Sequence, residues 1–180
     1  MKLLLGCGPS PIHQQHKDVM GDFKEWTFVD LHVEEAHIKN WDATKLKEVK
    51  NSSVEEIYSS HLLEHFPHTD TESILKRWYD VLIPGGKLIL NVPDLVWAAR
   101  ELVRLDNGQV LHGYYDQFEG EHGLLSIFYG SQSHDGEFHK TGFTASSIIN
   151  LLVRVGFKDI EVDQVHEAHD MRCLIVEAIK

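Results

Sequence analysis

Short apolar segments of strand length alternate with amphipathic segments of helical length along this chain of 180 residues. The strand candidates are apolar and β-branched runs bounded by polar or turn-forming residues, and they cover residues 2–7, 26–32, 36–43, 54–60 and 87–93. The helix candidates repeat apolar residues at helical spacing, and they cover residues 69–82, 94–105 and 144–156. Strands joined by helices favour a parallel sheet with helices on both faces.

Two further strand candidates, residues 157–166 and 171–180, follow one another with only a short turn between them. A parallel pair needs a crossover of about a dozen residues or more, so these two strands should form an antiparallel hairpin at the sheet edge. The length of the chain predicts a single α/β domain over residues 1–180. Asp70 or Thr71 is expected to cap the first helix and Asp94 the second.

Charge and composition limit the partners. The net charge of -11 disfavours a nucleic-acid partner, because an acidic protein repels phosphates. No apolar run approaches the ~18–20 residues of a membrane span, so no membrane contact is expected. Cys7 and Cys173 lie inside apolar runs, which predicts reduced, buried thiols in a cytoplasmic protein. Nothing in the charge pattern selects an oligomeric state, and a homodimer remains open.

Ligand-type residues stand where the first strands end. Gly6 and Gly8 follow the first strand candidate, and Asp30 ends the second. Ligands of open α/β sheets bind outside the carboxyl ends of the strands. Glycine lets the backbone turn tightly against a ligand, and an aspartate at this place can accept the hydroxyl hydrogens of a ribose. The alternative interpretation is a tight turn next to a solvated acid.

The end of the third strand adds Asp42, which lies beside the apolar Trp41. Its carboxylate can bind an adenine amino group, or it can cap a helix over residues 43–49. Pro11 occupies the third glycine position of the dinucleotide fingerprint G-x-G-x-x-G. Proline at this place also disfavours a clean helix N-terminus for a diphosphate. An adenosine ligand without phosphate therefore fits better than a dinucleotide.

The segment "HLLEH", residues 61–65, has the H-x-x-E-H spacing of inverted zinc peptidases. On a helix, His61 and His65 would share one face and could hold zinc, with Glu64 beside them. Pro67 keeps such a helix short, and the sequence shows no matched further ligand or orienting group of the kind that zinc sites need. We therefore expect no metal.

Several motifs together resemble the class I S-adenosylmethionine-dependent methyltransferases, most closely small predicted methyltransferases associated with sugar and cell-envelope biosynthesis. The matching segments are "LLLGCG", "FVDL", "WDAT", "VEEIYSSHLLEHF", "RWYDVLIPGGKLILNVPD" and "HKTGFT". The resemblance implies S-adenosylmethionine as cofactor. It also implies a Rossmann-like, seven-stranded, mostly parallel sheet in the order 3-2-1-4-5-7-6, with the antiparallel hairpin at the carboxyl-terminal end of the chain.

The resemblance also implies roles for single residues. The glycine turn would pass under the methionine portion of the cofactor, and the ends of the next strands would contact the ribose, the adenine and the region of the sulfonium. The residues in this order are Gly6, Cys7 and Gly8 for methionine, Asp30 for ribose, Leu31, Asp42 and Ala43 for adenine, and Ser60 and His61 near the sulfonium.

The acceptor implied by the resemblance is a small molecule or a glycan precursor. A hydroxyl acceptor needs a base near neutral pH, and His61 and His139 are the best candidates. Residues 106–143 are rich in aromatic residues and glycine, and we expect them to cover the active site, since no helix precedes the first strand. The rival hypotheses are a non-catalytic nucleoside-binding module on the same fold and a nicotinamide-dependent oxidoreductase, which Pro11 disfavours.

Overall fold

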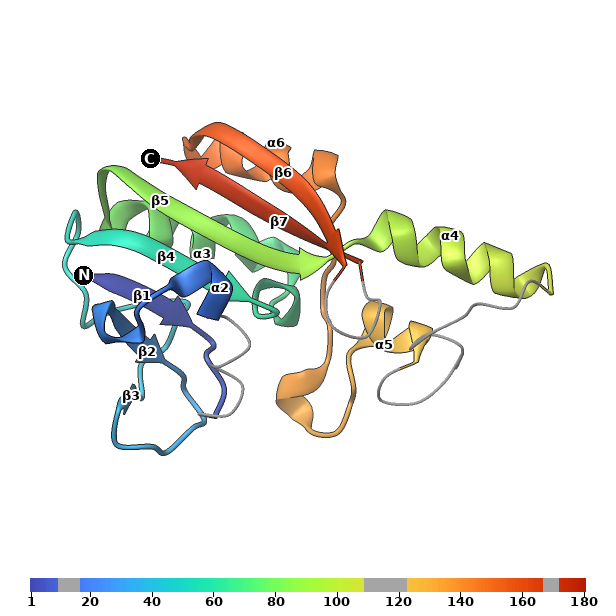
Figure 1. Cartoon of the computed structure of the whole chain (residues 1–180), viewed down its shortest axis with the longest axis horizontal. Helices are drawn as coiled ribbons and strands as arrows, with labels where there is room; N and C mark the ends of the chain where they lie inside the picture. Colours follow the sequence, from blue (N-terminus) through green and yellow to red (C-terminus); the bar gives the residue numbers. More distant parts are fainter. Residues whose placement is uncertain (10–16, 109–122, 167–171) are drawn as a thin grey trace.

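The computed structural model describes residues 1–9, 17–108, 123–166 and 172–180, and its centre is one seven-stranded sheet (Figure 1). The order β3-β2-β1-β4-β5-β7-β6 confirms the predicted fold class. The first five strands are parallel, and β7 runs antiparallel to both β5 and β6. The strands are β1 (Lys2–Leu5), β2 (Trp26–Val29), β3 (Ile38–Lys39), β4 (Val54–Ser60), β5 (Leu82–Pro93), β6 (Lys158–His166) and β7 (Arg172–Ile179).

The helices also follow the predicted order, with smaller elements between them. Predicted helices 69–82, 94–105 and 144–156 correspond to α3 (His68–Val81), α4 (Leu95–Asp106) and α6 (Ala145–Val155). The smaller elements are α2 (Lys17–Met20), η2 (Phe23–Glu25), η3 (Leu63–His65), α5 (Leu124–Tyr129) and η5 (Asp135–Glu137). Among the described helices, none is both long and apolar enough to cross a membrane.

The predicted helix caps have different outcomes. The Asp94 carboxylate accepts hydrogen bonds from the backbone N–H groups of Val96 and Trp97, which confirms it as the N-cap of α4. The cap predicted for α3 is wrong. That helix already begins after Pro67, whose fixed φ suits a helix start, and Asp70 therefore lies inside the first turn.

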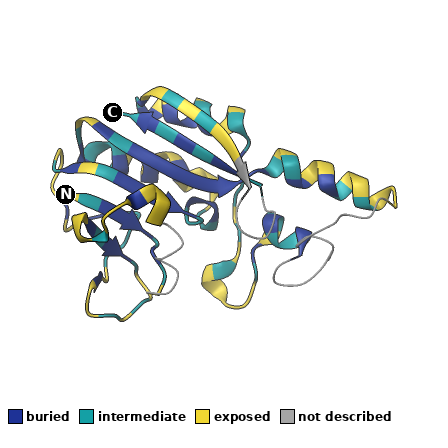
Figure 2. Cartoon of the chain, viewed as in Figure 1, coloured by how far each residue is buried: buried dark blue, intermediate teal, exposed yellow. Residues whose placement is uncertain are grey.

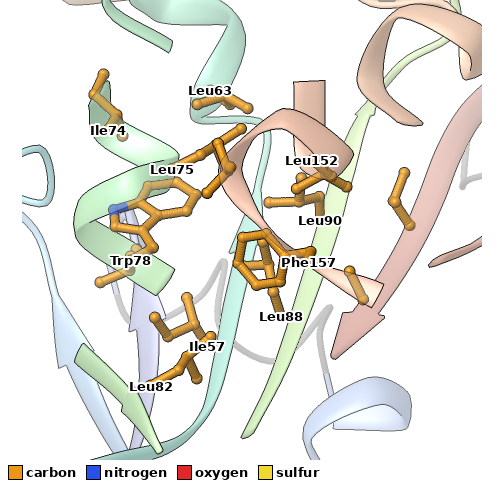
Figure 3. Close-up of a cluster of buried hydrophobic side chains, with 14 of the residues drawn as sticks. Ile57, Leu63, Ile74, Leu75, Trp78, Leu82, Leu88, Leu90, Leu152 and Phe157 are labelled. Atoms are coloured by element: carbon orange, nitrogen blue, oxygen red, sulfur yellow. The ribbon is translucent and has the colours of Figure 1, made fainter. Parts of the chain in front are cut away.

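The main core lies between the sheet and the pair α3 and α6, which sit behind the sheet in Figure 1. Trp78 of α3 is fully buried at its centre, and its Nε1 donates a hydrogen bond of 2.8 Å to the Ala43 carbonyl. Figure 3 shows the side chains that interlock there, among them Leu75, Leu88, Leu90, Leu152 and Phe157. This packing fixes the strands whose carboxyl ends carry the predicted site.

The other face of the sheet has a smaller cluster, in which Met20 of α2 packs with residues of β1, β2, β4 and β5. In Figure 1, α2 lies in front of the sheet, while α4 extends beyond the carboxyl end of β5. A third small cluster joins Ala98 of α4 to Leu124 and Ile127 of α5. Much of the remaining surface of α4 is exposed (Figure 2).

Candidate functional site

The turn after β1 requires glycine. Gly6 and Gly8 have φ values of +64° and +61°, in the left-handed region that disfavours other residues. A Cβ on Gly6 would lie 2.8 Å from Cδ1 of Leu62. The N–H groups of Gly6 and Cys7 both donate to the Val29 carbonyl, at 2.9 and 3.2 Å, and so fasten the turn to the end of β2.

Asp30 is joined directly to this turn. Its Oδ2 accepts a hydrogen bond of 3.0 Å from the Gly8 N–H, and its Oδ1 accepts one of 2.9 Å from the His32 N–H. A carboxylate has about four lone-pair positions, so Asp30 keeps acceptor capacity for a ligand. Leu31 is 47% exposed beside it and offers an apolar surface. The structure therefore brings Gly6, Gly8, Asp30 and Leu31 to one edge.

The side chains of two predicted site residues, Cys7 and Ser60, are buried. The Cys7 side chain is buried in the second apolar cluster, so only its backbone can border a ligand. Burial raises the pKa of the Cys7 thiol to about 12. Ser60, at the end of β4, is also buried, and its Oγ lies 3.2 Å from the Asn91 Nδ2 that donates to it.

The carboxylate of Asp42 interacts with residues that follow it closely in the sequence. It accepts a hydrogen bond of 2.9 Å from the Thr44 N–H and forms an ion pair of 2.6 Å with Lys45 Nζ. Burial acts to raise the pKa of Asp42, but the bonds from Lys45 and Thr44 outweigh it and hold that pKa below its ordinary value. Residues 43–49 form turns, so the alternative of a helix cap is wrong. The Ala43 carbonyl is the acceptor for Trp78.

Residues 61–65 do not form the α-helix that the zinc-peptidase spacing assumes. His61 has a φ of +47°, and only Leu63–His65 form one turn of 3-10 helix before Pro67. The positive φ stops the strand and prevents a continuous α-helix from starting at His61. His61 and His65 therefore do not share an α-helical face.

Glu64 is the centre of this segment. Its side chain is 1% exposed, and its Oε1 lies 3.3 Å from Nδ1 of His61. Burial alone would raise the pKa of this carboxyl, but the imidazoles of His61, His65 and His139 together hold it below its ordinary value. The other ring nitrogen of His61, Nε2, lies 3.7 Å from Sγ of Cys173.

His139 reaches the same place from a distant part of the sequence. Its Nδ1 lies 2.9 Å from the Ile127 carbonyl, and its ring centroid is 4.9 Å from that of His65. Burial lowers the pKa of His139. Both predicted catalytic histidines, His61 and His139, thus lie close to Glu64. Sequence reasoning gave Glu64 a role only in the zinc-peptidase alternative that it set aside, although an acid within the apolar run "LLEHF" is a signal of a buried carboxylate.

Comparisons with known proteins show which fold this arrangement belongs to. Residues 3–90 match the family described as a methyltransferase domain. An S-adenosylmethionine-dependent methyltransferase from Archaeoglobus fulgidus superposes with a TM-score of 0.65 at 13% identity, over 99% of this chain and 85% of that one. The chain has the fold of S-adenosylmethionine-dependent methyltransferases.

Other solved structures of this methyltransferase fold agree. The 1,6-didemethyltoxoflavin-N1-methyltransferase of Burkholderia thailandensis, solved with 1,6-didemethyltoxoflavin and S-adenosylhomocysteine, has a TM-score of 0.65 at 16% identity, over 99% of this chain and 70% of that one. A methyltransferase from Methanosarcina mazei has a TM-score of 0.61 at 17% identity, over 99% of this chain and 91% of that one. No curated protein matches the sequence significantly. The predicted association with sugar and cell-envelope biosynthesis gains no support from these comparisons.

Part of the predicted cover, residues 109–122 with Tyr114, Tyr115 and Phe118, lies outside the described residues, as does Pro11. Residues 106–108 of the predicted cover end α4 and follow it, and residues 123–143 contain α5 and η5 and return to the end of β4. There the N–H groups of Lys140 and Thr141 donate to the Glu64 carbonyl, at 2.9 and 3.1 Å.

Proposed function

We propose that this protein is an S-adenosylmethionine-dependent methyltransferase acting on a small molecule or a glycan precursor. The observation that carries the proposal is the hydrogen bond between the Gly8 N–H and the Asp30 carboxylate, at the sheet edge where open α/β folds bind ligands. It joins the turn of Gly6 and Gly8 to an acid with spare acceptor capacity. The match of residues 3–90 to the methyltransferase domain family supports the same function.

The residues present fit this cofactor. The positive φ values of Gly6 and Gly8 form the tight turn that would pass under the methionine portion, and Asp30 can accept the ribose hydroxyls. The exposed Leu31 offers an apolar surface to the adenine. When bound, the cofactor supplies a methyl group on a sulfonium, which is already activated for transfer. The protein's task is to hold the acceptor in line and to exclude water.

An acceptor hydroxyl also needs to lose its proton. His61 is held by its partners at the end of β4, where its Nδ1 faces Glu64. His139 donates its Nδ1 hydrogen to the Ile127 carbonyl, since a carbonyl can only accept, and this leaves the lone pair on Nε2. Either imidazole is a suitable proton acceptor near neutral pH.

The test is calorimetric titration with S-adenosylmethionine and with S-adenosylhomocysteine. Asp30→Ala should weaken binding by about 1.5–3 kcal/mol, or about 10- to 150-fold, since it removes hydrogen bonds to a charged group. Asp22→Ala is the control, because Asp22 is exposed and its carboxylate accepts a hydrogen bond from the Lys24 N–H of its own turn. Unchanged affinity in a folded Asp30→Ala variant would refute the ribose assignment.

A second measurement separates an enzyme from the rival nucleoside-binding module. The protein is incubated with methyl-labelled cofactor and pools of hydroxylated and amine-bearing small molecules, and label in the acceptor is measured together with S-adenosylhomocysteine. Transfer to one pool supports the enzyme. Tight cofactor binding without transfer to any pool would favour the module.

A further inference from the structure

Glu64, His65 and His139 each bring one metal-ligating atom within 4.8 Å of those of the other two. We propose that these three residues bind a divalent transition-metal ion. Glu64 and His65 lie in η3, while His139 follows η5, so the fold and not the sequence spacing assembles the set. The binding of the ion does not depend on the proposed function.

Both imidazoles are oriented as metal ligands usually are. Nδ1 of His139 lies 2.9 Å from the Ile127 carbonyl, and Nδ1 of His65 lies 3.3 Å from the Phe138 carbonyl. A carbonyl only accepts, so in each ring Nδ1 carries the hydrogen and Nε2 keeps its lone pair. Metal-ligating histidines almost always donate their other N–H in this way, which fixes the ring and its tautomer.

The carboxylate gives an independent reason to expect a cation. Both oxygens of Glu64 are buried, and within the described residues neither has a partner in hydrogen-bond geometry. An ionised carboxylate in such a place is strongly destabilising unless a charge compensates it. The Glu64 carboxylate forms an ion pair with His61, whose Nδ1 lies 3.3 Å from Oε1 and whose Nε2 lies near Cys173. His61 leaves Oε2 for a second partner, which the proposed metal ion would supply.

The backbone places His139 without relying on a flexible side chain. The Lys140 and Thr141 N–H groups hold the loop to the Glu64 carbonyl, and the His139 N–H donates to the Tyr129 carbonyl at 3.1 Å. The start of the loop is tightly packed, because a Cβ on Gly130 would come within 1.7 Å of the Glu137 carbonyl oxygen. Such a framework holds the ligands in place before an ion binds.

The donor set indicates the class of ion. Two imidazoles and one carboxylate suit zinc, iron(II), cobalt or nickel, whereas magnesium and calcium prefer oxygen ligands. Three protein ligands also leave an open position for water or substrate, as in catalytic zinc sites. The sequence led us to expect no metal, because no further ligand was evident in it. His139 provides that ligand, and the Ile127 and Phe138 carbonyls provide the orienting groups.

The location suggests a use for the open position. Leu62, two residues before Glu64, lies against the Gly6 turn. If the proposed function holds, an ion here would bind the acceptor's oxygen and lower its pKa, as metal ions do for bound water. His139 would then serve as a ligand, and His61 would remain the candidate base.

The test is titration of metal-stripped protein with cobalt(II), followed by absorbance, and with zinc(II), followed by calorimetry. We expect one ion per chain. His65→Ala, His139→Ala and Glu64→Gln should each weaken binding by at least about 100-fold, since loss of an orienting partner alone costs about 10- to 100-fold. His134→Ala is the matched control, because this exposed histidine also lies beside a carboxylate, with Nε2 3.6 Å from Glu137 Oε1. It should bind as the parent does.

The proposal is overturned if the folded parent binds neither ion, or if all variants bind as well as the control. If one of the three ligand variants does not fold, the other two carry the test. The rise in the melting temperature of the protein on adding zinc gives a second readout. Cofactor titrations of the same variants keep the two proposals apart. Metal binding without cofactor affinity refutes only the methyltransferase, and the reverse result refutes only the metal site.

Discussion

Cys7 stands between the two glycines of the β1 turn, yet its side chain faces the core. It packs with Leu4, Met20 and Trp26, and burial raises the pKa of its thiol from 9.0 to about 12. The unfolded chain therefore loses this proton at a lower pH than the folded protein. The stabilising effect of the buried thiol is complete below about pH 9 and is lost as the pH rises toward 12.

Cys7→Ala should remove this dependence on pH. Between pH 8 and pH 10.5, the parent should lose about 2 kcal/mol more unfolding free energy than the variant, since each pH unit between the two pKa values is worth about 1.36 kcal/mol. Urea unfolding at both pH values measures the difference. Parallel losses in the two proteins would show that the thiol titrates alike in the folded and unfolded chain.

Single site residues were predictable to different degrees. The requirement for glycine at Gly6 and Gly8 is local, so the sequence was enough to predict the turn, and Asp30 follows from its place at the end of a strand. The hydrogen bonds of Asp42 could not be read from its spacing, because an acid before threonine and lysine suits a turn as well as a helix cap. The proximity of His139 to Glu64 depends on the tertiary fold.

The two helix caps give a prediction at the scale of elements. Asp94→Ala should reduce the unfolding free energy by about 1–2 kcal/mol, because it leaves two N–H groups of α4 without their acceptor. Asp70→Ala, in the first turn of α3 but exposed, should cost about 0.5 kcal/mol or less. Chemical denaturation of both variants measures this. An equal loss in the two would mean that capping does not explain the role of Asp94.

Elements were predictable where the local pattern and the tertiary fold agree. β4 occupies Val54–Ser60, as its β-branched and apolar run indicates, and α6 ends at Gly156, as expected. β3 shrinks to Ile38–Lys39, because only these residues pair with β2. For residues 61–65 the H-x-x-E-H spacing is compatible with a helix, but the backbone there follows contacts with Asn91 and with the loop after η5.

At the scale of the molecule, the core between the sheet and α3 and α6 should unfold as one unit. Leu152→Ala should cost about 2–5 kcal/mol, because Leu152 is fully buried against the sheet. Its neighbour Val153 is 58% exposed, and Val153→Ala should change stability by about 0.5 kcal/mol or less. Urea unfolding should show one transition with an unchanged slope. Two separate transitions in Leu152→Ala would contradict a single cooperative core.

The topology was predictable at this scale. The alternation of elements predicts a parallel sheet, and the short turn after β6 leaves an antiparallel hairpin as the simplest solution. Family resemblance added the strand order. The course of residues 123–143 was not predictable in the same way, because irregular segments carry no period and depend on the surface that they meet. The predicted role of residues 106–143 as a cover of the active site stays a prediction.

The sheet order has a consequence for synthesis. β7 is the last of the seven strands in the sequence, yet it lies between β5 and β6. While the chain emerges from the ribosome, the pairing groups of Leu88–Val92 on that side of β5 stay open until residues 172–179 arrive. An open apolar strand edge readily pairs with other chains. A pause in translation shortly before β7 should therefore favour aggregation more than the same pause just after it.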